Sequence, residues 1–149
     1  MTLAENKKAR FDYEILEKIE AGIELKGGEV KAVKSGKMSL TGTYAVFRGG
    51  EMYLIGCDIA PYQPLNLTEE YDSKRSRRLL LHRSEMAELS LKVKERGLTL
   101  VPLSVYDRAG LVKVLLGLAK RKKKFDKREK IRERDEKRKI EVRLKKLED

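Results

Sequence analysis

Three runs of lysine and arginine are the residues of this chain best suited to a chemical task. They are NKKAR at 6–10, SKRSRR at 73–78 and KRKKKFDKR at 120–128. Clustered cations neutralise phosphates and gain free energy from the counterions that are released, so they favour a nucleic acid as the partner. A solubilising surface is the alternative for each run taken singly. The three runs together favour RNA binding.

Phe125 lies inside the third basic run and adds something that charge does not. An aromatic ring among cations can stack on a nucleic-acid base, a contact worth roughly 1–3 kcal/mol per base. The alternative is that the ring packs back onto the folded domain. We treat Phe125 as a candidate base contact.

The excess of positive charge is concentrated near the C-terminus. The 149 residues carry a formal net charge of +11; residues 120–149 hold 16 basic against 8 acidic side chains, and residues 1–119 hold 19 against 16. Such a potential attracts nucleic acid or anionic membrane. Membrane binding is disfavoured because the sequence has no Trp and only Phe125 as an aromatic after Tyr106. Without a long apolar run or a signal-like start, we expect a cytoplasmic protein.

Residues for catalysis or metal binding are scarce in the sequence. His82 is the only histidine and Cys57 the only cysteine, so neither a Cys/His zinc set nor an intramolecular disulfide can form. No GxSxG elbow accompanies His82, and the glycines of KGGE and RGGE do not match a P-loop. We interpret His82 as structural and Cys57 as a core residue. We expect no enzymatic activity and no cofactor.

The elements that position these residues are mostly short strands. TYAVFRGGEMYLI, centred on Gly49 and Gly50, predicts a tight hairpin, and the apolar runs on either side of DRAG at 107–110 predict another. Pro102 cannot donate to a ladder, so its strand is predicted to lie at an edge or to bulge there. Residues 60–78, with two prolines and no periodicity, predict a long loop.

Two helices are predicted between the strands. GEVKAVKSGK predicts a short helix that stops at Gly36, and SEMAELSLKVKERG predicts a longer one that stops at Gly97. Five or six strands with one to three inserted helices predict a mainly β domain over residues 1–119, a small antiparallel barrel of the OB type. A split sheet with helices on one face is the alternative.

Residues 120–149 form a basic C-terminal tail of different composition. The tail has no Gly or Pro and is rich in Lys, Arg and Glu, which favour helix. Its apolar residues are few, so it has little to bury. We predict that it is disordered or marginally helical alone and becomes ordered on an anionic partner.

A series of segments in a fixed order makes the chain resemble the SsrA-binding protein family, also called small protein B. The segments are NKKARFDYEILEKIEAGIELKGGEVKAVKSGK, APY, RRLLLH, RGLTLVPLSVY, LVKVLLGLAK and KKKFDKRE. The resemblance implies an OB-type barrel that binds transfer-messenger RNA. It also implies delivery of this RNA to bacterial ribosomes stalled on messages without a stop codon, the pathway called trans-translation.

The resemblance also implies which residues bind RNA. Four match positions that grip the tRNA-like domain: Tyr13, Glu20, Leu80 and Lys113. Five basic residues are expected to help: Lys7, Lys8, Arg10, Lys31 and Lys34. One tail segment matches the part that enters the decoding centre: Lys122, Lys123, Lys124, Phe125, Asp126, Lys127 and Arg128.

Two residues depart from the family pattern. Arg121 stands where many members have Gly, and Phe125 stands where members have His or another residue.

Three partners are expected from the resemblance. We expect a monomer that binds transfer-messenger RNA and small-subunit ribosomal RNA, together with elongation factor Tu on the aminoacylated RNA. Further along, the tail is expected to become helical in the empty message channel. A structural ribosomal protein or a general RNA-binding OB-fold protein is the alternative.

Overall fold

The computed structural model describes residues 1–62 and 71–122, together with Arg134 and Arg138. In these residues the strands are β1 (Thr2–Glu5), β2 (Tyr13–Ile23), β3 (Met38–Ser39), β4 (Tyr44–Arg48), β5 (Glu51–Ile55), β6 (Asp58–Ile59), β7 (Arg77–Leu80), β8 (Thr99–Arg108) and β9 (Leu111–Arg121). The helices are α1 (Lys7–Asp12), α2 (Gly27–Lys34) and α3 (Arg83–Arg96).

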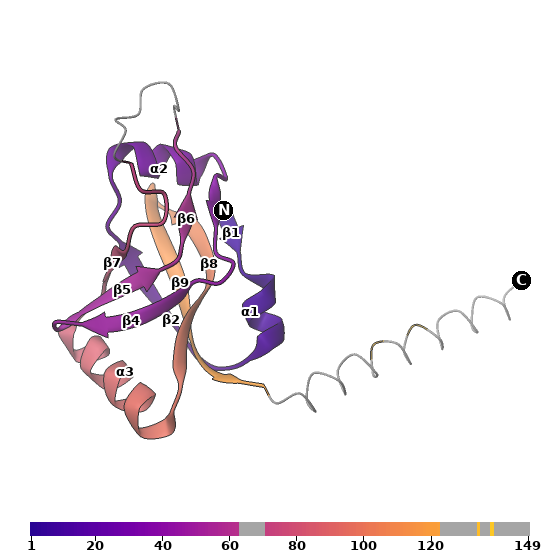
Figure 1. Cartoon of the computed structure of the whole chain (residues 1–149), viewed down its shortest axis with the longest axis vertical. Coiled ribbons are helices and arrows are strands. Elements are labelled where there is room, and N and C mark those ends of the chain that lie inside the picture. The colour runs from indigo at the N-terminus through magenta and orange to yellow at the C-terminus, as the bar shows by residue number, and fades with distance from the viewer. Residues whose placement is uncertain (63–70, 123–133, 135–137, 139–149) are drawn as a thin grey trace, which may run out of the picture.

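The main sheet closes on itself. Its strand order is β1-β8-β4-β5-β7-β2-β9, and β9 pairs with β8 as well as with β2. Six antiparallel strands therefore form a ring. β1 pairs with β8 on the same side as β4, farther along the strand. The short pair of β3 and β6 lies outside this sheet. The mainly β barrel predicted from the sequence is confirmed (Figure 1).

Alternation along the long strands directs one face of each into the barrel. In β9, the side chains of Val114, Leu116 and Leu118 are buried, and they belong to the main core cluster. Fully buried Leu54 of β5 and Leu79 of β7 belong to the same cluster. The opposite faces of these strands remain available for contacts outside the domain.

The predicted turns and helix ends are confirmed. Gly49 and Gly50 join β4 to β5 with φ of 59° and 80°. A two-residue turn of type I′ requires positive φ at both positions. α3 ends at Gly97, also in the left-handed region. α2 ends just before Gly36, as predicted.

Three sequence-based expectations are corrected. The loop predicted over 60–78 is too long, because Arg77 already begins β7. Pro102 lies in a strand paired on both sides, so the edge alternative is wrong; the ladder of β8 and β9 instead shifts register between Pro102 and Ser104, as the bulge alternative predicted. The count of five or six strands omitted β1 and the very short β3 and β6.

The helix α1 was not predicted from the sequence, because it depends on distant contacts. The Asn6 side chain accepts a hydrogen bond from Ala9 N at 3.1 Å and caps the helix. The same side chain donates to Leu40 O at 3.2 Å and to Pro102 O at 2.9 Å. A six-residue helix is too short to be stable alone, so these bonds to other elements are what support it.

The last strand leads directly toward the tail. β9 continues to Arg121, and the backbone N–H of Lys122 donates to Asp12 O at 2.9 Å. The other tail residues expected in the decoding centre lie outside the described residues, so their roles stay predictions: Lys123, Lys124, Phe125, Asp126, Lys127 and Arg128. Arg134 and Arg138 have helical backbone and exposed side chains.

Candidate nucleic-acid interface

The outer face of four neighbouring strands brings distant residues into one row. Leu80 of β7 is the cross-strand partner of Gly22 in β2, and Gly22 is also the partner of Lys113 in β9. Lys113 is in turn opposite Tyr106 of β8. Adjacent strands are about 5 Å apart, so this row places Leu80 and Lys113 about 10 Å from each other.

Leu80 is presented to solvent because Gly22 leaves room for it. A Cβ at Gly22 would lie only 3.2 Å from the Cβ of Leu80. The Leu80 side chain therefore lies over the bare backbone of β2 and remains 47% exposed. An apolar side chain held in this way can pack against the flat face of a base or sugar.

Glu20 lies two residues before Gly22, on the same face of β2, and is held by two partners. The Tyr106 hydroxyl donates to one carboxylate oxygen, and Arg108 Nη1 lies 3.0 Å from both oxygens. The hydrogen bond from Tyr106 is the main cause that lowers the pKa of Glu20, against the opposing effect of burial. The nearby charges of Arg108 and Lys113 lower this pKa further.

Tyr106 is held in its protonated form by the same contact. Burial, and next the hydrogen bond to the Glu20 carboxylate, raise the pKa of Tyr106 to about 12. At neutral pH the pair is therefore a neutral phenol that donates to an ionised carboxylate. The carboxylate keeps the Arg108 guanidinium at the edge of the row, where the Arg108 side chain is 68% exposed.

These contacts define what we call the Glu20 surface: Glu20, Gly22, Leu80, Tyr106, Arg108 and Lys113. Three of the four residues predicted to grip RNA belong to it, and Tyr13 does not. Tyr106, Arg108 and Gly22 were missed in the sequence. Tyr106 and Arg108 could have been found from the sequence, because they lie next to and within the DRAG turn, on the strand predicted to pair with LVKV.

One of the two helper lysines on α2 reaches this surface. Lys34 Nζ donates to Gly110 O at 2.9 Å, in the turn between β8 and β9. Lys31 points instead to the Tyr62 ring, whose centroid is 6.0 Å from Lys31 Nζ and 5.7 Å from Lys37 Nζ. Lys34 therefore adds a further cation at the border of the Glu20 surface, whereas Lys31 lies beside Tyr62.

Tyr13 and the basic residues of α1 form a separate group at the other end of the barrel. Tyr13 begins β2, opposite Arg121, and seven residues along a strand place it about 23 Å from Glu20. Lys8, Tyr13 and Arg121 line a groove of about 260 Å³ beside the point where the tail leaves the barrel (Figure 1). Lys7 and Arg10 are exposed on the same helix. The predicted RNA-binding residues are therefore divided between two sites.

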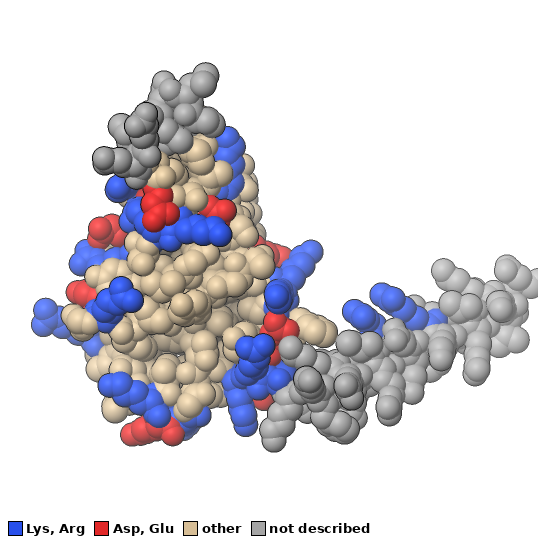
Figure 2. Space-filling model, in the orientation of Figure 1, with Lys and Arg blue, Asp and Glu red and all other residues tan. Residues whose placement is uncertain are grey.

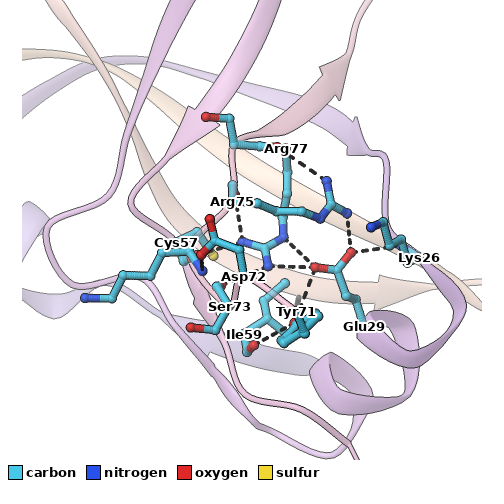
Figure 3. A network of polar contacts seen from close by, with 11 residues as sticks. Lys26, Glu29, Cys57, Ile59, Tyr71, Asp72, Ser73, Arg75 and Arg77 are labelled. Carbon is cyan, nitrogen blue, oxygen red and sulfur yellow. Dashed lines mark hydrogen bonds and ion pairs between the residues drawn. The ribbon is translucent and has the colours of Figure 1, made fainter. Parts of the chain in front are cut away.

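The basic run at 73–78 has a structural role that the sequence did not reveal. Arg77 is fully buried, and its Nε and Nη2 lie 3.0 Å and 2.6 Å from Glu29 Oε2. Arg75 pairs with the other oxygen of Glu29, and Lys26 N donates to it at 2.9 Å (Figure 3). The interpretation of this run as an RNA contact is wrong for Arg77, because its guanidinium cannot be reached from solvent.

The network joins α2 to the segment that leads into β7. Arg77 also donates to the backbone oxygens of Cys57 at 2.7 Å and Ser73 at 2.9 Å, so its charge is almost fully hydrogen-bonded. Burial alone would raise the pKa of Glu29, but the Lys26 N–H and the two guanidinium groups lower it overall. Glu29 is therefore an ionised, buried carboxylate.

The two residues considered for catalysis have structural positions. Cys57 is fully buried, and burial raises its pKa to about 12, so the thiol is not a nucleophile at neutral pH. His82 precedes α3, and its backbone N–H donates to the Glu85 carboxylate at 3.3 Å. Within the described ranges, no group of three His, Cys, Asp or Glu side chains could hold a metal ion. No helix in this part of the chain is long and apolar enough to cross a membrane.

Positive and negative side chains are interspersed on the surface of the barrel. Figure 2 shows Lys and Arg on several sides of one face, with Asp and Glu between them. The RNA-binding prediction therefore depends on specific groups of side chains, and no single uniform basic face carries it.

Comparison with known proteins places the chain in one group. A family model described as SmpB protein matches residues 3–146. An SsrA-binding protein of Chlorobaculum tepidum is 50% identical over 142 residues, which cover 95% of this chain and 90% of the relative. An SsrA-binding protein of Acetivibrio thermocellus is 49% identical over 143 residues, which cover 96% of this chain and 92% of the relative.

A solved structure agrees with these matches. It is described as tmRNA-SmpB on a journey to the centre of the bacterial ribosome, and its chain is 52% identical to this one. The match covers 80% of this chain and 84% of the other, with a TM-score of 0.66.

Proposed function

The chain belongs to the SmpB protein family, and on this premise we propose that it is an RNA-binding adaptor of trans-translation. It binds the tRNA-like domain of transfer-messenger RNA and delivers this RNA to stalled bacterial ribosomes. The 52% identity to a chain described as tmRNA-SmpB of the bacterial ribosome supports both partners. The protein works by binding and acts in the cytoplasm, with no chemical step of its own.

The observation that carries this proposal is the row of the Glu20 surface. Leu80 and Lys113 come from segments far apart in the sequence, and the antiparallel register places them on one face about 10 Å apart. An apolar side chain beside cations suits a structured RNA, because the cations meet phosphates while the apolar group meets a sugar or base. Glu20 keeps Arg108 in place for this contact.

The second group of residues contacts the same RNA at the other end of the barrel in this proposal, and the tail serves the ribosome. α1, which carries Lys7, Lys8 and Arg10, lies on the side of the barrel from which the tail leaves (Figure 1), and Tyr13 pairs with Arg121 at the end of β9. The tail segment from Lys122 to Arg128 enters the decoding centre, and the rest of the tail occupies the empty message channel. A tail and a message that compete for one phosphate-lined channel provide selectivity without any reading of sequence.

In this proposal the barrel binds transfer-messenger RNA, and the tail binds the ribosome. We propose residues 1–119 as the RNA-binding domain and 120–149 as the tail, with β9 reaching Arg121. Elongation factor Tu would accompany the complex through the aminoacylated end of the RNA. The protein itself acts as a monomer.

The test is the identity of the RNA that the protein carries. Tagged full-length protein is purified from a bacterial lysate, and the bound RNA is sequenced before and after a high-salt wash. We expect transfer-messenger RNA to be strongly enriched. Ribosomal RNA in constant stoichiometry after the wash, without transfer-messenger RNA, would instead favour a structural ribosomal protein.

A further inference from the structure

A groove between α3 and the hairpin of β4 and β5 belongs to neither group of predicted RNA contacts. It has a volume of about 880 Å³ and is lined by residues of the hairpin turn and of α3. Figure 1 shows that α3 passes the turn of this hairpin. Phe47, Leu81 and Met86 line it, and all three are half-buried and pack on the main core. The floor of the groove is therefore apolar and rigid.

Three cations surround this floor. Arg48 ends β4, Arg83 begins α3 and Lys94 lies in the last turn of α3; all three line the groove and are exposed. Among the described residues, none of the three forms an ion pair or a side-chain hydrogen bond. Glu51 is the one carboxylate that lines the groove, and it lies 4.0 Å from Arg78 Nη1.

The position of Arg83 is unfavourable for the helix itself. A cation in the first turn lies at the positive end of the helix dipole, where its charge destabilises the helix. Arg48 is the cross-strand partner of Glu51 but is not paired with it. Arg83 therefore does not stabilise the start of the helix, and Arg48 forms no direct ion pair among the described residues, so both guanidinium groups are available to an anionic ligand.

The size of the groove favours a strand of nucleic acid over a small anion. Arg83 and Lys94 are eleven residues apart on one helix, which corresponds to about 16 Å along its axis. Cations that are so far apart are better matched by several phosphates along a strand than by one phosphate. Arginine stacks on bases and binds phosphate with two hydrogen bonds, and an apolar floor suits an unstacked base.

The groove also continues from the Glu20 surface. Leu79 of β7 is opposite Met52 of β5, so the next residues in the antiparallel ladder, Leu80 of that surface and Glu51 of the groove, are neighbours on the outer face. We propose that the groove binds a single-stranded or unstacked segment of the same transfer-messenger RNA that the Glu20 surface holds. This inference rests on the proposed function and extends its interface around the barrel to α3.

The test compares two double variants of the full-length protein in binding to transfer-messenger RNA at several salt concentrations. Arg83→Ala/Lys94→Ala removes two cations of the groove, and alanine keeps α3 helical. Lys26→Ala/Arg96→Ala is the matched control, because it removes the same charge from exposed residues that lie outside the predicted RNA contacts and do not line the groove. Thermal unfolding of each variant checks that the fold is retained.

We expect the groove variant to bind transfer-messenger RNA roughly tenfold more weakly than wild type. The slope of log affinity against log salt should fall by about 1.4, the value for two lost contacts to single-stranded phosphates. The control should match the wild type apart from a small loss of general attraction. Equal binding by the groove variant and the control would overturn the proposal, whereas failure of the wild type to bind this RNA would overturn the proposed function.

A photo-crosslink identifies the occupant directly. A benzophenone-bearing residue replaces Ser90, which lines the groove, in the full-length chain. A crosslink to transfer-messenger RNA is expected. A crosslink only to ribosomal RNA or only to a protein would overturn the assignment, even if Arg83 and Lys94 affect ribosome binding.

Discussion

At the scale of single residues, the Glu20 surface explains how a carboxylate can be useful on a protein that binds an anion. Glu20 does not repel the ligand as a free charge would, because Tyr106 and Arg108 occupy both of its oxygens. Its negative charge offsets part of that of Arg108 but fixes the direction of the guanidinium. A fixed cation loses less conformational entropy when it meets a phosphate than a mobile one does.

Tyr106→Phe should weaken the binding of transfer-messenger RNA severalfold without unfolding the protein. The variant keeps the ring but removes the hydroxyl donor, so Arg108 is held by a less constrained carboxylate. The pKa of Glu20 should rise toward its ordinary value, because the Tyr106 hydrogen bond is the main cause that lowers it. Electrophoretic mobility shifts measure the affinity, and an NMR titration of the Glu20 carboxyl measures the pKa.

Tyr53→Phe is the control for this substitution, because Tyr53 is a partly exposed tyrosine on β5 that lies outside the Glu20 surface and lines neither groove. It should leave both the affinity and the titration of Glu20 unchanged. If Tyr106→Phe bound the RNA as tightly as wild type, the positioning role of Glu20 would be wrong.

At the scale of elements, one buried carboxylate decides where α2 lies. Glu29 is 2% exposed and accepts hydrogen bonds from Lys26 N, Arg75 and Arg77 (Figure 3). α2 carries Lys34, which in turn contacts the turn between β8 and β9. The network therefore links a structural ion pair to the border of the RNA-binding surface.

Glu29→Gln should lower the free energy of unfolding by about 3–5 kcal/mol, because it leaves the buried Arg77 charge without its counter-ion. Glu24→Gln is the matched control: Glu24 pairs with Arg78 at 2.7 Å but is exposed, so its loss should cost less than about 1 kcal/mol. Urea unfolding at pH 7 measures both. Similar losses for the two variants would contradict the structural role of the network.

The same residue predicts how the stability of the protein depends on pH. The pKa of Glu29 is lower in the folded state than its ordinary value of 4.5, so the folded state favours the ionised form. This contribution is fully present above 4.5 and is lost as the pH falls from there through the lowered pKa of the folded state. The stability difference between wild type and Glu29→Gln should therefore shrink below about pH 4.5, and a constant difference down to about pH 3 would contradict the assignment.

At the scale of the whole molecule, the closed barrel and the tail have different tasks in the proposed function. The ring closes through β8 and β9, so the barrel needs no strand from beyond Arg121. Both predicted RNA-binding groups and the groove lie on this barrel. The contacts of the tail belong to the ribosome.

A chain that ends at Lys122 should bind transfer-messenger RNA within about twofold of wild type at moderate salt, because base-specific and surface contacts of the barrel remain. It should not support tagging of stalled peptides, because nothing occupies the decoding centre. Affinity is measured with purified RNA, and tagging is measured in a reconstituted translation system. Normal tagging by the truncated chain would contradict the division of tasks.

Phe125→Ala in the full chain provides the finer comparison and should also spare RNA binding but impair tagging.

The local features of this protein can be predicted from its sequence. The two glycines of RGGE and the glycine after KER have φ angles that few other residues adopt, so the hairpin turn and the end of α3 were readable from a few residues. Alternation predicted the strands, and the resemblance in a series of ordered segments predicted the family to which the chain belongs. The excess charge of the tail is also a property of the sequence alone.

Which residues share a surface became clear from the three-dimensional arrangement of the strands. Register across β7, β2, β9 and β8 places Leu80, Lys113 and Tyr106 in one row, and it separates Tyr13 from them. The ring likewise buries Arg77 while its neighbour Arg78 stays exposed, although both lie in the same basic run. The physical reason is that turns depend on local dihedral preferences, whereas register and burial depend on pairing between segments that are dozens of residues apart.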